Sequence, residues 1–181
     1  MMKKNLLILG AGGHGHVVKE TAEAMEIFDN IEFLDDQLEK AIGKLNEIES
    51  FSKEYRYAFI AIGNNKIRMQ WIKKAEELGF NIPVLIHPKA MVSSSTSIYP
   101  GSIVTLGAII NANVVVEKGC IISAGSIIDH DSFIGFGTHV DCGAIVKSHC
   151  LVLGNSKIES GTIITKDDLP SSEDFIKSKG F

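Results

Sequence analysis

The chain has 181 residues, of which 45% are hydrophobic and 22% charged, and a formal net charge of -4. That mild acidity excludes a broad nucleic-acid surface, because phosphate backbones are bound by clustered Lys and Arg. No segment approaches the roughly 18 apolar residues of a membrane-spanning helix, and the apolar run near the N-terminus is too short for a signal peptide. We therefore expect a cytoplasmic protein with neither nucleic acid nor membrane as a partner.

Strand-like and helix-like segments alternate in the first 88 residues. Residues 5–10, 31–36 and 57–63 are apolar runs typical of buried strands, and residues 15–25 and 65–79 have a helical period. Such alternation predicts a small parallel sheet with right-handed crossovers. We expect a first domain at residues 1–88.

A glycine-rich loop follows the first predicted strand. Gly10, Gly12 and Gly15 fit G-x-G-x-x-G, and Asp35 lies 20 residues after Gly15, where an acidic residue can hold ribose hydroxyls. A dinucleotide bridges two mononucleotide halves, whereas this segment supplies one, so the loop favours a single nucleotide over a nicotinamide cofactor. Arg68 could reach a phosphate, but a solvated helix face is the expected place for it.

A six-residue repeat replaces the helical period after residue 88. Every sixth residue is Val or Ile at thirteen consecutive positions: Val92, Ile98, Val104, Ile110, Val116, Ile122, Ile128, Ile134, Val140, Val146, Val152, Ile158 and Ile164. A small residue usually lies two positions before each aliphatic, and Gly, Asn or Asp often lies three positions after it.

A strand of four or five residues followed by a turn, repeated every six residues, predicts a parallel β-helix with the aliphatic side chains inside. Three hexads make one triangular coil, so residues 89–168 form a little over four coils, and residues 169–181 form a C-terminal tail. The alternative is a β-sandwich, but its turns recur roughly every 8 to 12 residues and not every six.

The chain resembles the bacterial sugar acyltransferases that include sialic acid O-acetyltransferases and the N-acetyltransferases of UDP-linked 4-amino sugars. The segments that carry the resemblance are GAGGHGHVV, FLDDQ, AIGNNKIR, LIHPKAMVSSSTSI and IIDHDSFIGFGTHV. The resemblance implies an α/β half-Rossmann domain followed by a left-handed β-helix of hexapeptide repeats, with acetyl-CoA as acyl donor and no metal.

The resemblance also implies that the first domain binds the uridine and diphosphate of a nucleotide sugar. The residues that match the family motifs are Gly12, Gly13, His14, Asp35, Asp36, Gly63 and Asn64. Glycines at a helix start let backbone amides approach phosphate, and a carboxylate can accept hydrogen bonds from uracil or ribose. From the residues alone, Asp35 and Asp36 could equally end a strand in a solvated turn.

The hexad SIIDHD offers a titratable group beside a carboxylate. Acyl transfer needs a base for the incoming nucleophile, and His130 titrates near neutrality with Asp131 beside it. The resemblance implies that His130 is the general base and that Asp131 raises its basicity. Two alternatives stay open. Asp129 could be the partner of His130, or His130 could be a solvated corner residue without a catalytic role.

His139 matches a family position that contacts acetyl-CoA, and Gly143, Ser148 and Ser160 are further candidates by position. His139 lies on another side of the coil from His130, so one chain cannot bring the two to one substrate. We therefore expect a homotrimer with active sites between subunits. Ser123 is a departure from the family pattern, because relatives often have Asn at this position.

The expected function is N-acetylation of a UDP-linked amino sugar for surface glycan synthesis. The alternatives are O-acetylation of sialic acid and a non-catalytic binding protein built from the same repeats. A nicotinamide-dependent enzyme is a third possibility that the glycine loop alone does not exclude.

Overall fold

The computed structural model describes residues 4–37 and 41–168, so the predicted tail at 169–181 lies outside the described residues. The chain divides into two compact units, Met1–Pro88 and Lys89–Phe181. Within the described residues, no helix has both the length and the apolar character needed to cross a membrane.

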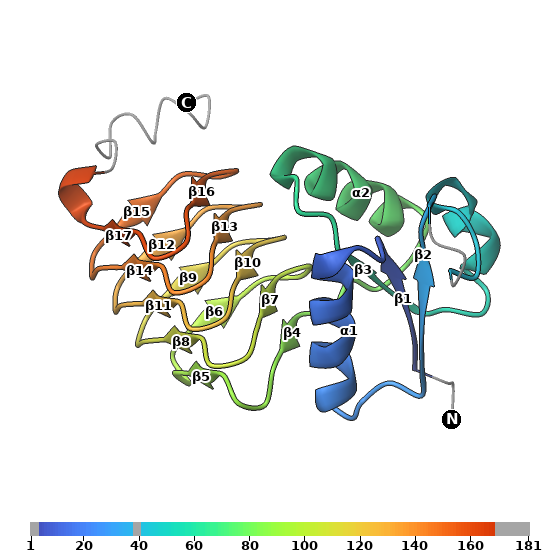
Figure 1. The fold of residues 1–181 in the computed structure, drawn as a ribbon, viewed down its shortest axis with the longest axis horizontal. Coiled ribbons are helices and arrows are strands. Elements are labelled where there is room, and N and C mark those ends of the chain that lie inside the picture. Colours follow the sequence, from blue (N-terminus) through green and yellow to red (C-terminus); the bar gives the residue numbers. More distant parts are fainter. Residues whose placement is uncertain (1–3, 38–40, 169–181) are drawn as a thin grey trace. The chain divides into compact units, whose positions relative to one another are not determined.

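The first unit is built on a three-stranded parallel sheet (Figure 1). The strands are β1 (Asn5–Leu9), β2 (Asn30–Leu34) and β3 (Tyr57–Ile60), in the order β2-β1-β3. The helices are α1 (Gly13–Ala24) and α2 (Asn65–Glu77), with the 3₁₀ helix η1 (Leu45–Phe51) and the short strand β4 (Leu85–Ile86). The sequence predicts the three strands and both helices, and η1 is an addition.

Apolar residues of all three sheet strands are buried together with residues of α2 and η1. The cluster contains Leu7, Leu9, Leu34, Ile48, Tyr55, Ala58, Ile60, Ile72, Ala75, Phe80 and Ile82. Because β1 is the central strand, it is buried along its whole length, and all of its residues after Asn5 are apolar. The loop that follows β1 therefore lies between the loops that follow β2 and β3.

Two glycines of the loop after β1 have structural reasons to be glycine. Gly10 has φ +100°, which side-chain-bearing residues rarely adopt, and a Cβ on Gly15 would lie 2.2 Å from the carbonyl oxygen of Gly10. Gly15 thus lets α1 pack closely against the end of β1. Gly12, in contrast, has open space around its Cβ direction.

The second unit is a parallel β-helix with three faces (Figure 1). Face 1 contains β5 (Met91–Val92), β8 (Ile109–Ile110), β11 (Ile127–Ile128), β14 (Ile145–Val146) and β17 (Ile163–Ile164). Face 2 contains β6 (Ser97–Ile98), β9 (Val115–Val116), β12 (Phe133–Ile134) and β15 (Leu151–Val152). Face 3 contains β7 (Ile103–Val104), β10 (Ile121–Ile122), β13 (His139–Val140) and β16 (Lys157–Ile158), and the 3₁₀ helix η2 (Lys166–Asp168) follows β17.

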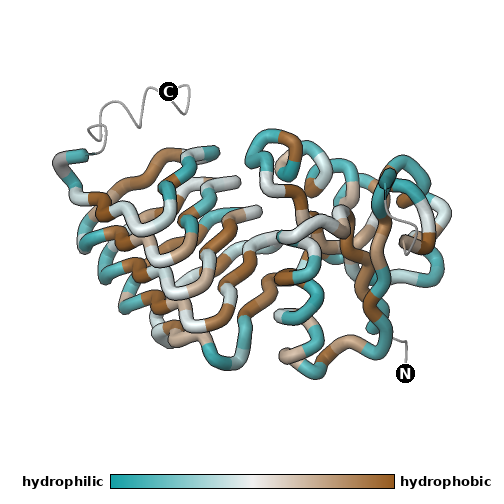
Figure 2. The backbone as a smooth tube through the Cα atoms, in the orientation of Figure 1, coloured by the Kyte–Doolittle hydropathy of each residue, from teal (hydrophilic) through white to brown (hydrophobic). Residues whose placement is uncertain are grey.

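The predicted aliphatic positions form the interior of this helix. Ten consecutive ones, from Val104 to Ile158, are buried, and the three at the end coils, Val92, Ile98 and Ile164, are partly exposed. Figure 2 shows the apolar segments recurring on successive coils. The predicted strand length is wrong: each strand has two residues and not four or five, because the remaining residues of every hexad form the corner.

The corner between faces 1 and 2 differs from the other two. Its left-handed turn residues carry side chains, with φ 59° at Asn113, 56° at Asp131 and 58° at His149. The corresponding positions at the other corners are glycines, except for Asn155. Since residues with side chains are uncommon at positive φ, this one corner concentrates polar groups at a conformational cost.

Candidate active site

His130 and Asp131 lie on the corner between faces 1 and 2, directly after β11. The Nδ1 atom of His130 lies 2.7 Å from Oδ2 of Asp131, and both side chains are exposed. In the tautomer whose Nδ1 donates to Asp131, Nε2 keeps its lone pair and can accept a proton. The two neighbours thus form a base oriented by a carboxylate.

Two asparagines of the preceding coil hold the two acidic residues beside His130. Asn113 Nδ2 donates to Asp131 Oδ1 at 3.0 Å, and Asn111 Nδ2 donates to Asp129 Oδ1 at 2.9 Å. Asp129 Oδ1 also accepts the backbone N–H of His130 at 2.9 Å. The structure therefore pairs the imidazole with Asp131, and Asp129 holds the backbone beneath it.

These contacts shift the protonation of the pair in opposite directions. The hydrogen bond to Asp131 raises the pKa of His130 above its usual value, with a smaller contribution from the charge of Asp129. The hydrogen bonds from His130 and Asn113 lower the pKa of Asp131. Asp131 is consequently a carboxylate at neutral pH, and His130 is a stronger base than a free histidine.

A second histidine lies on the same corner, one coil further along. The backbone N–H of His149 donates to the carbonyl oxygen of His130 at 3.2 Å, and the two rings are edge to face with centroids 5.3 Å apart. Ser148 follows β14 as His130 follows β11, since β11 and β14 pair in register. The structure thus groups Ser148 with His130 and not with the other predicted cofactor residues.

His139 lies on face 3, across the triangular coil from the corner that holds His130. Its Nε2 is 3.0 Å from the hydroxyl of Ser123 and 3.7 Å from Oδ1 of Asp141, and its side chain is 17% exposed. Ser160 hydrogen bonds to Asp141, so it belongs to this group as well. Ser123, the departure from the family pattern, therefore fills a hydrogen-bonding position beside His139.

Gly143 forms the left-handed turn that follows this group, at the corner between faces 3 and 1, with φ 66°. A Cβ at this position would meet no atom within 4 Å, so space beside the turn is open. Of the four predicted cofactor residues, His139, Gly143 and Ser160 lie on face 3 or its corner. Ser148 lies on the opposite corner.

The predicted nucleotide-binding residues gather at the carboxyl edge of the first unit's sheet. Gly12 and Gly13 open α1, and Gly63 precedes α2; all three have open space around their Cβ directions. Asn64 caps α2 by accepting the N–H of Ile67 at 3.1 Å. Helix starts with bare backbone amides are suited to phosphate.

The two aspartates of the first unit both bind backbone amides of neighbouring loops. Asp35 accepts from Ala11 N at 2.8 Å and from Gln37 N at 2.8 Å. Asp36 accepts from Leu45 N at 3.0 Å. Each carboxylate therefore has a structural role, and Asp35 in particular ties the end of β2 to the loop after β1.

The expectation for Arg68 is wrong, because its side chain is fully buried and does not lie on a solvated face. Its guanidinium donates to the carbonyl oxygens of Ile62 at 2.9 Å and Gly63 at 3.1 Å, and to Asn65 Oδ1 at 2.9 Å. Arg68 thus holds the turn that presents Gly63 and Asn64. A helical period places Arg68 on a helix, but it does not show that the turn before the helix folds over its side chain.

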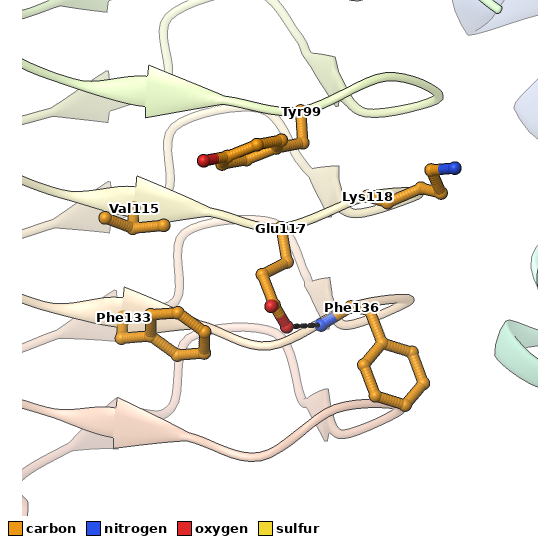
Figure 3. Close-up of a pocket in the computed structure, with 6 residues that line it drawn as sticks. All are labelled: Tyr99, Val115, Glu117, Lys118, Phe133 and Phe136. Atoms are coloured by element: carbon orange, nitrogen blue, oxygen red, sulfur yellow. Dashed lines mark hydrogen bonds between the residues drawn. The ribbon is translucent and has the colours of Figure 1, made fainter.

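An apolar pocket of about 220 Å³ lies on face 2. Figure 3 shows its lining residues: Tyr99, Val115, Glu117, Lys118, Phe133 and Phe136. Glu117 accepts the backbone N–H of Phe136 at 2.9 Å, which ties two coils together. The pocket contains none of the predicted site residues, and Tyr99 and Phe136 remain 51% and 40% exposed.

Comparison with known proteins identifies relatives of both units. The family model of the PglD N-terminal domain matches residues 5–75. The acetyltransferase domain of PglB from Neisseria gonorrhoeae, solved in complex with acetyl coenzyme A, is 31% identical; the match covers 91% of this chain and 97% of that one, with a TM-score of 0.66. The chain belongs to the bacterial sugar acetyltransferase family. Its fold is accordingly the predicted α/β half-Rossmann domain followed by a left-handed β-helix.

Two further relatives bear on the acceptor. PerB from Caulobacter crescentus, solved in complex with CoA and GDP-perosamine, is 26% identical, covers 93% of this chain and 91% of its own, and has a TM-score of 0.79. UDP-N-acetylbacillosamine N-acetyltransferase from Bacillus subtilis (strain 168) is 32% identical over 114 residues, or 56% of this chain. The match spans about half of that curated relative, 51% of its length.

Proposed function

We propose that this protein transfers the acetyl group of acetyl-CoA to the amine of a nucleotide-linked sugar, as a step in surface glycan synthesis. One observation carries the proposal: an exposed imidazole, His130, is held through Nδ1 by a carboxylate at 2.7 Å on the corner of a sugar acetyltransferase β-helix. The reaction would take place in the cytoplasm, together with its acyl donor.

His130 supplies the proton transfer that the reaction requires. Its Nε2 removes a proton from the sugar amine, whose nitrogen attacks the thioester carbonyl carbon. As the carbon–sulfur bond breaks, the imidazolium returns the proton to the departing CoA sulfur, so charge and atoms balance. Asp131 stabilises the imidazolium between these two steps and fixes the ring orientation.

The first unit supplies binding in this proposal. Gly12 and Gly13 at the start of α1 leave room for the diphosphate, and Asp35 and Asp36 are the candidates for uracil or ribose. A UDP-linked amino sugar is the acceptor we favour, because one relative is named for such a substrate. His14, Gly63 and Asn64 complete the proposed contacts.

The decisive experiment measures CoA release by the untagged chain in a buffer that contains EDTA. The acceptors offered are UDP-4-amino sugars, GDP-perosamine and sialic acid. We expect turnover with a nucleotide-linked amino sugar and a fall in kcat of about 10²–10⁴-fold in His130→Asn. His16→Asn, which alters an exposed histidine outside the proposed site, serves as control.

Each result separates the competing functions. A product whose acetyl group is released by hydroxylamine is an ester and would favour O-acetylation. Absence of turnover with every acceptor contradicts the proposed activity. Full activity of His130→Asn contradicts the assignment of the base, and would favour a site elsewhere on the molecule.

We further propose that three chains assemble, with the His130 corner of one against face 3 of its neighbour. His130 and His139 lie on opposite parts of the triangular coil, so one chain cannot bring both to one acetyl group. The outward residues of face 1, Met91, Ile109, Ile127, Ile145 and Ile163, form an aliphatic column, and Met91 and Ile163 are 66% and 55% exposed. Exposed apolar faces of this kind are typical of subunit contacts.

We expect His130→Ala and His139→Ala each to lose most of the activity, and co-expression of the two variants tests this arrangement. His130→Ala chains keep His139, and His139→Ala chains keep His130, so a mixed trimer contains an intact site wherever the two intact histidines meet. Random assembly predicts about one quarter of wild-type activity from the mixture, by the statistics of a cyclic oligomer. Activity no higher than that of the single variants would show that each site lies within one chain.

A further inference from the structure

Three side chains with metal-binding atoms meet on the corner between faces 1 and 2. His130, Asp131 and His149 each offer one ligand atom, and these atoms lie within 4.8 Å of one another. All three residues are exposed in the single chain. In the proposed trimer the same corner must stay open to the substrate, so an ion from solution can reach it there as well. His149 has no part in the chemistry proposed above.

The backbone holds these three residues in place before any ion arrives. His130 and His149 are joined by a backbone hydrogen bond of 3.2 Å, and their coils pair in register through β11 and β14. Asn113 fixes Oδ1 of Asp131 at 3.0 Å, which leaves Oδ2 on the side of His130. Preorganised ligands lower the entropic cost of binding.

Two imidazoles and one carboxylate are a ligand set suited to zinc and its transition-metal neighbours, and poorly suited to magnesium or calcium, which prefer oxygen ligands. Atoms bound to tetrahedral zinc at about 2.0–2.1 Å are about 3.3 Å apart. Ligand atoms already within 4.8 Å need only small side-chain rotations to reach this arrangement.

We propose that the corner formed by His130, Asp131 and His149 binds one transition-metal ion of the zinc class, and that this ion inhibits the enzyme. The ion is a reversible inhibitor and has no role as a cofactor. Coordination through one nitrogen of His130 leaves the proton on the other, so neither nitrogen can then accept a proton from an acceptor amine. The binding site rests on the geometry alone, and the inhibition rests on the proposed function.

Titration calorimetry of the untagged full chain with zinc chloride tests the binding. We expect one ion per chain, no comparable heat with magnesium chloride, and a Co²⁺ absorption band in the visible range. His149→Asn should weaken zinc affinity at least about tenfold, since even loss of a residue outside the ligand set commonly costs that much. Asparagine suits the left-handed conformation at this position, so the variant retains the turn.

Asn155→Gly, at a left-handed turn on another corner, is the matched control and should bind zinc like the wild type. Equal zinc affinity of His149→Asn and the wild type, or the absence of a one-to-one complex, would overturn the site. If the chain binds zinc but acetylates none of the acceptors, the binding site stands and the proposed function fails. If the chain is active and binds zinc at this corner without losing activity, the proposal that zinc inhibits the enzyme is wrong.

Discussion

The two units position polar groups by different means. In the first unit a single buried residue, Arg68, holds the Ile62–Asn65 turn through its side chain, inside a core assembled from several elements. In the β-helix, polar groups on one coil are held by groups eighteen residues earlier, as Asn113 holds Asp131. One unit depends on an individual buried contact, and the other on a repeated short-range one.

This difference has consequences for mutation. Loss of a contact in a stacked repeat affects mainly the neighbouring coil, because each repeat contacts only its neighbours. Loss of a buried group in the first unit leaves polar atoms without water or partner inside one shared core. The first unit should therefore respond to substitution mainly in stability, and the His130 corner mainly in chemistry.

The largest expected effect on stability follows from Arg68→Met. The carbonyl oxygens of Ile62 and Gly63 lose buried donors, so the free energy of unfolding should fall by about 1–3 kcal/mol in urea titration. Lys73→Met is the matched control on the same helix: its side chain is 79% exposed and its ion pair with Glu77 spans 3.8 Å. The control should change stability by less than about 0.5 kcal/mol.

The Michaelis constant for the nucleotide sugar should also rise in Arg68→Met, because the turn before α2 loses its support. Equal effects of the two substitutions on stability would mean that the buried guanidinium contributes no more than an exposed lysine. In that case the contrast between the two units would not hold.

The smaller expected effect concerns pH and involves the corner of the β-helix. Since His130 must be neutral to act as base, activity falls as pH drops through its pKa, and the Asp131 hydrogen bond places that fall at higher pH than for an ordinary histidine. Asp131→Asn removes the carboxylate, so the acid limb of kcat/KM should move to lower pH. The maximal rate should fall by less than the roughly 10²–10⁴-fold that loss of the base itself costs.

Asp129→Asn provides the comparison for this pH profile, measured in EDTA. Its charge raises the pKa of His130 less than the Asp131 hydrogen bond does, so its acid limb should move in the same direction by a smaller amount. Neither substitution should change the free energy of unfolding appreciably, because Asp131 is exposed, Asp129 is only partly buried, and asparagine keeps an oxygen that can accept the same hydrogen bonds. If Asp129→Asn shifts the acid limb more than Asp131→Asn does, Asp129 and not Asp131 is the partner of His130.

Much of the candidate site is already predicted from the sequence. His130 and Asp131 occupy one hexad, and the spacing places them on a corner. The asparagines that hold the acidic pair, Asn111 and Asn113, were not predicted, although each lies eighteen residues before its partner and the repeat contains that signal. His149 likewise lies eighteen residues after Asp131.

The sequence by itself determined the β-helix, because a hexapeptide period is a local property: each inward Val or Ile needs only the coil above and below it to be buried. Tertiary structure alone decided that Asp131 and not Asp129 pairs with the imidazole, and that Arg68 is buried. The physical reason is the same in each case. The direction of a side chain at a turn and the burial of a charged group depend on residues that fold over it, and no spacing along the chain specifies those contacts.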